Sequence, residues 1–267
     1  MNFIILSPVD IAIAATLLIL NAALSIFLRL RLEKQMLVAA ARMVVQLLLM
    51  GLVLKTLFNL DSALFTSLTA LFMMLFAGRE VMARQKRRLK GWWSYGLGTS
   101  SMVFSCTLVT VFALTTQVRP DPWYEARIAL PLLGMILGNT MTGVALGIDR
   151  LLTGAAAERS AIEARLALGH PRAEAFGNVI REAMRTGMIP TVNSMSAIGL
   201  VSIPGMMTGQ ILAGVAPMEA VKYQLLIMFL IAGGTGFGVL AAVLVGAGRL
   251  TDQRHRLRLD RLRASSD

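Results

Sequence analysis

Cysteine, histidine and charged residues are scarce in this sequence of 267 residues, and each shortage excludes a class of protein. With one Cys and two His, the chain can form neither a disulfide framework nor a zinc site of clustered Cys and His side chains. Charged residues make up 15% of the chain, hydrophobic residues 56%, and the mean hydropathy is +0.67. A globular protein of this composition could not cover its surface with polar groups, so we predict an integral membrane protein.

Two kinds of chemical site are also missing. The sequence contains no G-x-x-x-x-G-K-[ST] phosphate loop, so we expect no ATPase activity, no catalytic residue and no bound cofactor in this chain. No Asp, Glu or His lies deep in an apolar run, which disfavours a chelating site for a hard divalent ion and a proton-driven carrier. We therefore assign no metal ligands.

What the sequence does contain is a series of apolar runs long enough to cross a bilayer. A hydrocarbon core about 30 Å thick needs roughly 20 apolar residues in a helix. Seven stretches meet or approach this length, at 8–28, 36–57, 62–78, 92–114, 128–148, 188–212 and 223–247. The prediction is an all-α, polytopic membrane helix bundle of about seven transmembrane helices, with residues 1–267 forming one transmembrane domain.

The basic residues indicate which loops face the cytoplasm. Most of the 26 Lys and Arg residues follow the first, third and fifth runs or fill the C-terminal tail, and these four segments lie on one side of a seven-span path. Positively charged loops stay cytoplasmic, so the N-terminus is expected outside, and the loop 149–187 and the tail 248–267 inside. A solvated or nucleic-acid-binding face is the alternative, but the alternation with apolar runs favours the membrane, and we expect no nucleic-acid partner.

Polar side chains inside the apolar runs are candidates for a substrate path, because an unpartnered polar group in hydrocarbon is costly. Pro204 should kink or break the sixth run. Each of these residues could have a structural role instead. The polar side chains could form hydrogen bonds that only hold the bundle together, the Arg42 side chain could reach the lipid headgroups, and the Met side chains could only fill space. The candidate path residues are Arg42 and Gln46 in the second run, Asn139 and Thr140 in the fifth, and Asn193, Ser194, Ser196, Met206, Met207 and Gln210 in the sixth.

The later runs also contain G-x-x-x-G pairs, which allow neighbouring helix backbones to approach closely. These pairs favour packing into a bundle or a dimer without selecting a function. They are Gly134 with Gly138, Gly143 with Gly147, Gly205 with Gly209, and Gly234 with Gly238.

The long loop 149–187 is predicted to form two short helices. Ser160 and Glu163 have the spacing of a capping box, Gly169 is typical of a helix terminus, and Pro171 favours the start of the next helix. Such a helix pair could receive a push from a partner protein. It could also lie on the lipid surface. A helix-turn-helix that binds DNA is less favoured, because both ends of the pair are tethered to the membrane.

Three stretches resemble a known family. ARMVVQLLLMGLVL at 41–54, PLLGMILGNTMTGVALGIDRL at 131–151 and MIPTVNSMSAIGLVSIPGMMTGQILAG at 188–214 are similar to the bacterial ABC-type iron-exporter permeases, whose plant relatives include an aluminium-tolerance permease. The resemblance implies a multi-pass permease subunit of the bacterial inner membrane that exports iron or another metal. It also implies a cytoplasmic ATP-binding cassette subunit as partner, and a homodimer of this chain in the complex.

The loop also resembles part of a coupling motif. Glu163, Ala164 and Gly169 match the first half of the motif with which ABC importer permeases contact their ATPase, whereas Val179 and Arg181 depart from its second half. The resemblance therefore assigns ATPase coupling to Glu163, Ala164 and Gly169 only. A gradient-driven secondary transporter of a small solute and a seven-helix receptor are the competing functions.

Overall fold

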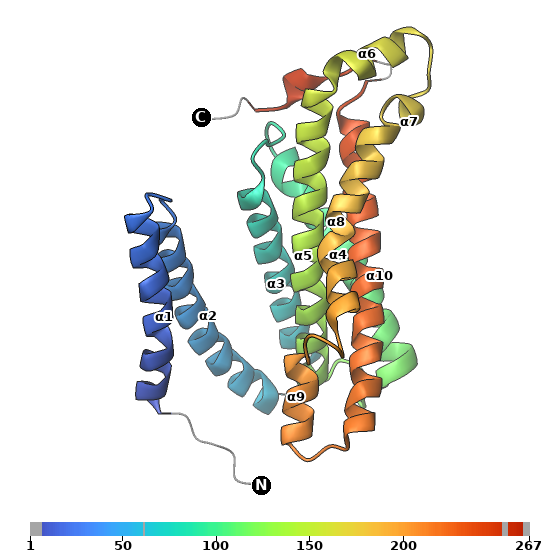
Figure 1. Ribbon diagram of the computed structural model, residues 1–267. Coiled ribbons are helices and arrows are strands. Elements are labelled where there is room, and N and C mark those ends of the chain that lie inside the picture. Colours follow the sequence, from blue (N-terminus) through green and yellow to red (C-terminus); the bar gives the residue numbers. More distant parts are fainter. Residues whose placement is uncertain (1–6, 61, 253–255, 264–267) are drawn as a thin grey trace. The chain divides into compact units, whose positions relative to one another are not determined.

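The computed structural model describes residues 7–60, 62–252 and 256–263, and regular structure there is helical apart from three isolated β-bridges (Figure 1). Two compact units divide the chain, Met1–Asp61 and Ser62–Asp267. Among the described helices, six are long and apolar enough to cross a membrane: α1, α2, α3, α4, α5 and α10. The predicted class, an all-helical multi-pass membrane protein, is confirmed.

The first unit is a hairpin of α1 (Pro8–Phe27) and α2 (Glu33–Leu60). Its first helix starts at a capping box, in which the Ser7 hydroxyl accepts from the Asp10 N–H and the Asp10 carboxylate accepts from the Ser7 N–H. Ser25 holds the turn between the helices, because its hydroxyl donates to Glu33 at 2.9 Å and accepts from the Leu32 N–H at 3.0 Å.

The second unit is a bundle of helices with a helical hairpin at one end (Figure 1). The helices are α3 (Ala63–Arg84), α4 (Trp93–Ala113), α5 (Ala126–Ala157), α6 (Arg159–Ala167), α7 (Arg172–Ala175), α8 (Gly177–Ala197), α9 (Gly205–Leu212) and α10 (Pro217–Arg249). A π-helical turn, Leu114–Val118, extends α4, and a short 3-10 turn, Leu259–Arg261, lies in the tail.

Helix α5 is central in this bundle and packs against α3, α4, α8 and α10. Glycines allow the closest approaches. A Cβ on Gly143 would lie 2.6 Å from Thr235 Cγ2 and 2.8 Å from the Gly187 carbonyl oxygen, and one on Gly238 would lie 2.6 Å from Thr140 Cγ2. Two of the predicted G-x-x-x-G pairs, Gly143 with Gly147 and Gly234 with Gly238, therefore form helix contacts.

The predicted run 188–212 is not one helix. It is divided between the C-terminal half of α8 and the whole of α9, with a non-helical segment at 198–204 between them. The predicted break at Pro204 is present, because this proline immediately precedes α9. The break is longer than one residue, however, since α8 already ends seven residues before Pro204. The reason is Gly199, whose φ of +88° turns the chain so that its N–H bonds to the Ser202 carbonyl oxygen.

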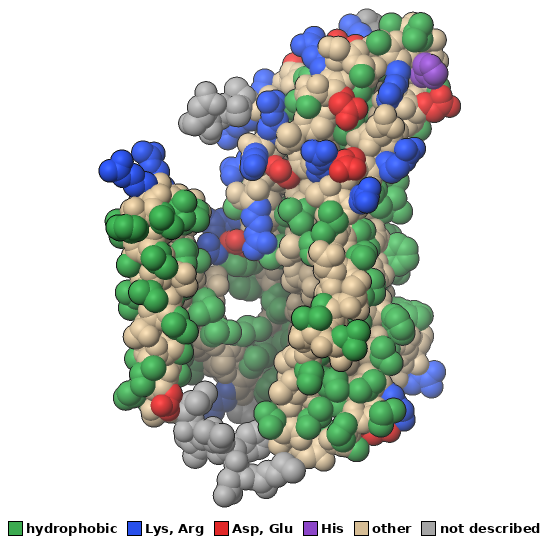
Figure 2. Space-filling model, viewed as in Figure 1, with side chains coloured by type: hydrophobic (Ala, Val, Ile, Leu, Met, Phe, Trp, Pro, Cys, Tyr) green, Lys and Arg blue, Asp and Glu red, His purple; other side chains and the backbone are tan. Residues whose placement is uncertain are grey.

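The basic segments of the second unit meet at one end. The Lys86 N–H donates to the Asp149 carboxylate at 2.7 Å, Lys90 N–H to the Arg261 carbonyl, and Arg263 N–H to the Arg88 carbonyl, both at 2.8 Å. Figure 2 shows Lys and Arg side chains crowded over this end, where α6, α7 and the tail lie. The loop after α3, the 149–187 connection and the tail thus share one end of this unit, as their charge predicted.

Candidate functional site

The predicted path residues of the fifth run, Asn139 and Thr140, are adjacent on α5 but differ in burial. Thr140 is fully buried between α5 and α10, where Gly234 and Gly238 leave room for its side chain. Its Oγ1 lacks a hydrogen-bond partner of ordinary geometry among the described residues. Asn139 is exposed on the bundle surface, and its side-chain amide donates to the Met135 carbonyl at 2.8 Å.

Helix register brings Asn139 level with the end of α8. The two helices are antiparallel and Gly143 lies opposite Gly187, so one turn further along each places Asn139 beside Thr191. The predicted path residues Asn193, Ser194 and Ser196 follow within two turns, and all three are exposed. Ser196 donates to the Val192 carbonyl oxygen at 2.9 Å.

The break after α8 carries side chains that are apolar and unusually exposed. Leu200 is 93% exposed and Val201 83%, on a tight turn closed by hydrogen bonds from the Val201 and Ser202 N–H groups to the Ala197 carbonyl. Exposed residues of this size and polarity mark a surface that another protein or lipid covers.

Helix α9 contributes the last three predicted path residues. Met206, Met207 and Gln210 are half-buried, and Met206 packs against the core of the unit. The Gln210 side-chain oxygen is buried and has no hydrogen-bond partner in the described part of the chain. Thr140 and Gln210 are therefore the predicted path residues that hold an unpartnered oxygen atom away from solvent.

Arg42 and Gln46 belong to the first unit, where both are exposed and lie one turn apart on α2. In the described residues, no group of three or more His, Cys, Asp or Glu side chains comes together in a way that could hold a metal ion.

Polar residues on α4 and α10 were missed by the sequence analysis. Thr235 is fully buried beside Gly143, and Thr110 and Gln224 are buried as well, each with an oxygen atom that lacks a partner among the residues described. Ser105 is also fully buried and donates to the Gly234 carbonyl oxygen. The hydroxyl-rich segment 99–107 of α4 was the available signal, because several Ser and Thr side chains close together in a transmembrane helix favour an inward face.

The predicted coupling residues lie on the α6–α7 hairpin, at the basic end of the bundle. Glu163 is exposed and pairs with Arg159 at 2.9 Å, Ala164 is exposed, and Gly169 has a φ of +87° that ends the first helix. The predicted capping box at Ser160 is wrong. Because α6 follows α5 almost directly and begins at Arg159, Ser160 already lies inside the helix.

The hairpin is fastened to the bundle by buried apolar side chains. Ile162 is fully buried, Leu166 packs against the core, and Phe176 is 1% exposed at the start of α8. Leu168, at the tip, is 79% exposed. The apolar edge of α6 therefore contacts protein, and the tip leaves a small apolar surface for a partner.

Comparisons with known proteins agree with this architecture. A family model described as "Uncharacterised protein family (UPF0014)" matches residues 8–250. The chain is 39% identical to the UPF0014 membrane protein slr1647 of Synechocystis, over 76% of this chain and 77% of the relative. It is 31% identical to the probable iron export permease protein FetB of Escherichia coli, over 95% and 96%, and 30% identical to the protein ALUMINUM SENSITIVE 3 of Arabidopsis thaliana, over 83% and 79%. No solved structure matches.

Proposed function

This chain belongs to the UPF0014 family of membrane proteins, and on that premise we propose that it is the permease subunit of an ABC transporter that exports iron or another metal. A separate cytoplasmic ATPase subunit supplies the energy. One relative is named as a probable iron export permease and another after aluminium sensitivity. The sequence itself lacks a phosphate loop, so ATP hydrolysis belongs to the partner.

The observation that carries the proposal is the course of α8. This helix starts at the buried Phe176 beside the α6–α7 hairpin and ends at the break next to Asn193, Ser194 and Ser196. Its 21 residues span about 31 Å. A push on the exposed hairpin is therefore delivered along one continuous helix to the polar residues of the path.

In this proposal, α8 and α9 together form a seventh, discontinuous span. The ten residues 188–197 and the eight of α9 rise about 27 Å, close to the thickness of the hydrocarbon core. Figure 1 shows α9 beyond the end of α8, at the end of the unit where α10 begins. Broken helices beside small and polar residues are common at the substrate sites of transporters.

We place the chain in the bacterial inner membrane. With seven spans, its basic loops and its C-terminal tail lie in the cytoplasm, and its N-terminus lies outside the cell membrane. The three basic segments of the second unit share one end, as the positive-inside rule requires of cytoplasmic loops. The fourth, at 29–34, joins α1 to α2 and faces the same side when both helices cross. Residues 1–267 then act as one permease domain, with Arg42 and Gln46 contributing to the path.

A second copy of the chain completes the path. Asn193 and Ser194 are exposed beside apolar residues of α8, and contact with hydrocarbon at this depth would leave their polar groups unpartnered. A Cβ added to Gly138, Gly205 or Gly209 would have no neighbour within 4 Å, so the backbone at these glycines is open to another helix. Pairing of two copies covers both features.

The coupling proposal is tested in the full chain, co-expressed with a candidate ATP-binding cassette ATPase from the same organism. In the double variant Glu163→Arg and Gly169→Pro, copurification of the ATPase should fall at least about tenfold, because the charge is reversed and proline cannot adopt a positive φ. The matched control is Glu219→Arg, which removes an exposed ion pair with Lys222 on α10, at the far end of the unit from α6. Undiminished copurification and transport in the double variant would overturn the coupling role.

The dimer proposal is tested by disulfide crosslinking. In a Cys106→Ala background, Asn193→Cys should crosslink to its symmetry mate on mild oxidation in membranes. Phe104→Cys, at an exposed position on α4, is the control and should remain monomeric on a denaturing gel.

Transport that stops when ion gradients are dissipated, while ATP is present, would support a gradient-driven carrier instead.

A further inference from the structure

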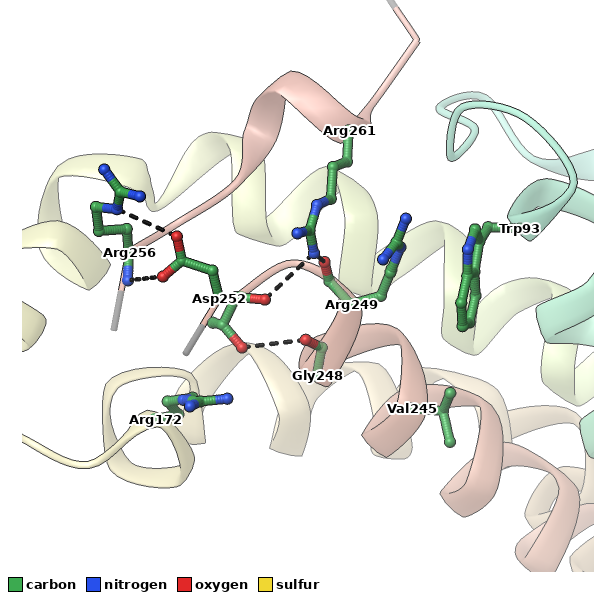
Figure 3. Close-up of a pocket in the computed structure, with 9 residues that line it drawn as sticks. Trp93, Arg172, Val245, Gly248, Arg249, Asp252, Arg256 and Arg261 are labelled. Carbon is green, nitrogen blue, oxygen red and sulfur yellow. Dashed lines mark hydrogen bonds and ion pairs between the residues drawn. The ribbon is translucent and has the colours of Figure 1, made fainter. Parts of the chain in front are cut away.

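A basic cavity lies at the cytoplasmic end of α10, away from the proposed path. Its volume is about 720 Å³. Figure 3 shows that its walls come from the first turn of α4, the start of α7, the last turn of α10 and the folded-back tail. Its lining includes Trp93, Arg172, Val245, Arg249, Asp252 and Arg261.

The charge of the cavity is strongly positive and only partly neutralised. Four arginines line it, against one carboxylate, Asp252. Asp252 is already engaged by Arg256, through Nε at 3.1 Å and the backbone N–H at 3.0 Å. Among the residues described, no carboxylate forms an ion pair with Arg172, Arg249 or Arg261.

The nearby Arg258 lies outside the lining, pairs with Asp260 and also reaches the Asp252 carboxylate, at 3.7 Å. The Arg258 guanidinium donates two hydrogen bonds to Asp260, at 2.8 and 2.9 Å, and lowers the pKa of that carboxyl to about 2. Asp260 is therefore ionised at neutral pH, with its hydrogen bonds taken by Arg258, and it offsets only part of the charge of Arg261.

The arginines of the cavity are held in place by other groups. Arg261 donates to the backbone carbonyls of Arg249, at 2.6 Å, and Thr251, at 3.3 Å, which keeps its guanidinium inside (Figure 3). The Arg249 guanidinium lies over the Trp93 ring, 4.5 Å from its centre. A cluster of oriented guanidinium groups is suited to the oxygen atoms of a phosphate group.

The position of the cavity identifies the source of that phosphate. Arg249 is the last residue of α10, a spanning helix, so the cavity lies where hydrocarbon gives way to headgroups. On the α10 and α4 side, Val245 is 50% exposed and Trp93 42% exposed, and they extend the apolar bundle surface up to the arginines. Trp is the side chain that prefers this depth.

We propose that this cavity is a binding site for the phosphate headgroup of an anionic phospholipid, with an acyl chain lying along Trp93 and Val245. Basic pockets between transmembrane helices on the cytoplasmic side are typical sites for such headgroups. Bound lipid would join α4, α7, α10 and the tail at the base of the α6–α7 hairpin. The site thus goes beyond the proposed transport function and does not depend on the ATPase.

The test uses the purified full chain in detergent, without any ATPase, so that its outcome is independent of the permease proposal. Lipid-bound protein is measured by native mass spectrometry during titration with phosphatidylglycerol or phosphatidylcholine of the same acyl chains. Phosphatidylglycerol should bind at least about tenfold more tightly. Arg172→Gln and Arg249→Gln should each reduce that preference several-fold, and Arg249→Lys should retain part of it.

The control is Arg159→Gln, an exposed arginine of α6 that pairs with Glu163 and does not line the cavity. It should bind phosphatidylglycerol like the unchanged chain. Equal affinity for the two lipids, or undiminished preference in Arg172→Gln and Arg249→Gln, would overturn the proposal. Displacement of the lipid by millimolar inorganic phosphate or deacylated glycerophosphoglycerol would overturn the acyl-chain contact and assign the site to a soluble phosphate.

Discussion

The hairpin of the first unit and the bundle of the second use similarly apolar helices in different ways. In the most apolar 18 residues of α2, no residue is buried, whereas 56% of the residues are buried in the most apolar 18 residues of α10. Glycine explains much of the difference. Gly51 in α2 has nothing within 4 Å of a Cβ position, while Gly234, Gly238 and Gly246 in α10 each receive a side chain of a neighbouring helix. Apolar length therefore decides whether a helix crosses, and small residues decide whether it packs.

The largest effect that would break this comparison is expected from a glycine substitution in the bundle. A Cβ in Gly187→Ala would lie 2.7 Å from Val239 Cγ1 and 2.9 Å from the Gly143 carbonyl oxygen, so the α5–α8–α10 contact must open. We expect a loss of about 2–3 kcal/mol or more in the free energy of unfolding. Gly51→Ala is the matched control and should change stability by less than about 1 kcal/mol. Circular dichroism melts in detergent compare the two, and equal melting temperatures would refute the glycine explanation.

An intermediate effect on stability is expected at Ser25, which holds the turn between α1 and α2 in the first unit. Ser25→Ala removes the hydrogen bonds to the Glu33 carboxylate and the Leu32 N–H, at a local cost of about 1–2 kcal/mol. Hydrogen exchange should rise at residues 28–33 and stay unchanged in the second unit. Thr16→Ala, which removes only an exposed bond to the Ile13 carbonyl, is the control. Faster exchange spread over both units would show that they are not separate cooperative structures.

The smallest change in stability is expected from Thr140→Val, which keeps the shape of the side chain and removes a buried hydroxyl that makes no hydrogen bond of ordinary geometry among the described residues and lies beside the Cys106 thiol. The free energy of unfolding should stay within about 1 kcal/mol of the original value. Metal transport in proteoliposomes with the ATPase should still fall several-fold if Thr140 belongs to the path. Thr110→Val removes a similar buried hydroxyl of α4, outside the proposed path, and should leave transport intact. Equal transport in both variants would make Thr140 a packing residue.

Most of the spans were predictable because a transmembrane helix satisfies its backbone hydrogen bonds within its own segment. The runs at 8–28 and 36–57 correspond closely to α1 and α2, and the run at 223–247 lies inside α10. The run at 188–212 failed as a single helix, because its break depends on the conformation of Gly199 as well as on Pro204.

The candidate path was harder to predict, because the sequence does not show whether a polar side chain within an apolar run faces the core or the surface. Asn139 and Thr140 are neighbours in sequence, yet one is exposed and the other fully buried. On α10, Thr235 was missed because its sequence neighbours are glycines and apolar residues, and Gln224 because it lies at the very start of its run, next to Lys222 and Tyr223. The likeness of the chain to an iron export permease, by contrast, was visible in the stretch 188–214 and is confirmed by the family match.

The sequence by itself determined the class of this protein, the six apolar helices long enough to cross a membrane and the family to which the chain belongs. Hydropathy, helix length and the positions of Lys and Arg are local properties, and a bilayer acts on each segment separately. Only the tertiary structure decided which glycines are filled by neighbouring side chains, how far the break before α9 extends, and that Arg172, Arg249 and Arg261 line one cavity. These features depend on contacts between helices that are far apart in the chain, and a local pattern such as G-x-x-x-G favours a contact without selecting the partner helix.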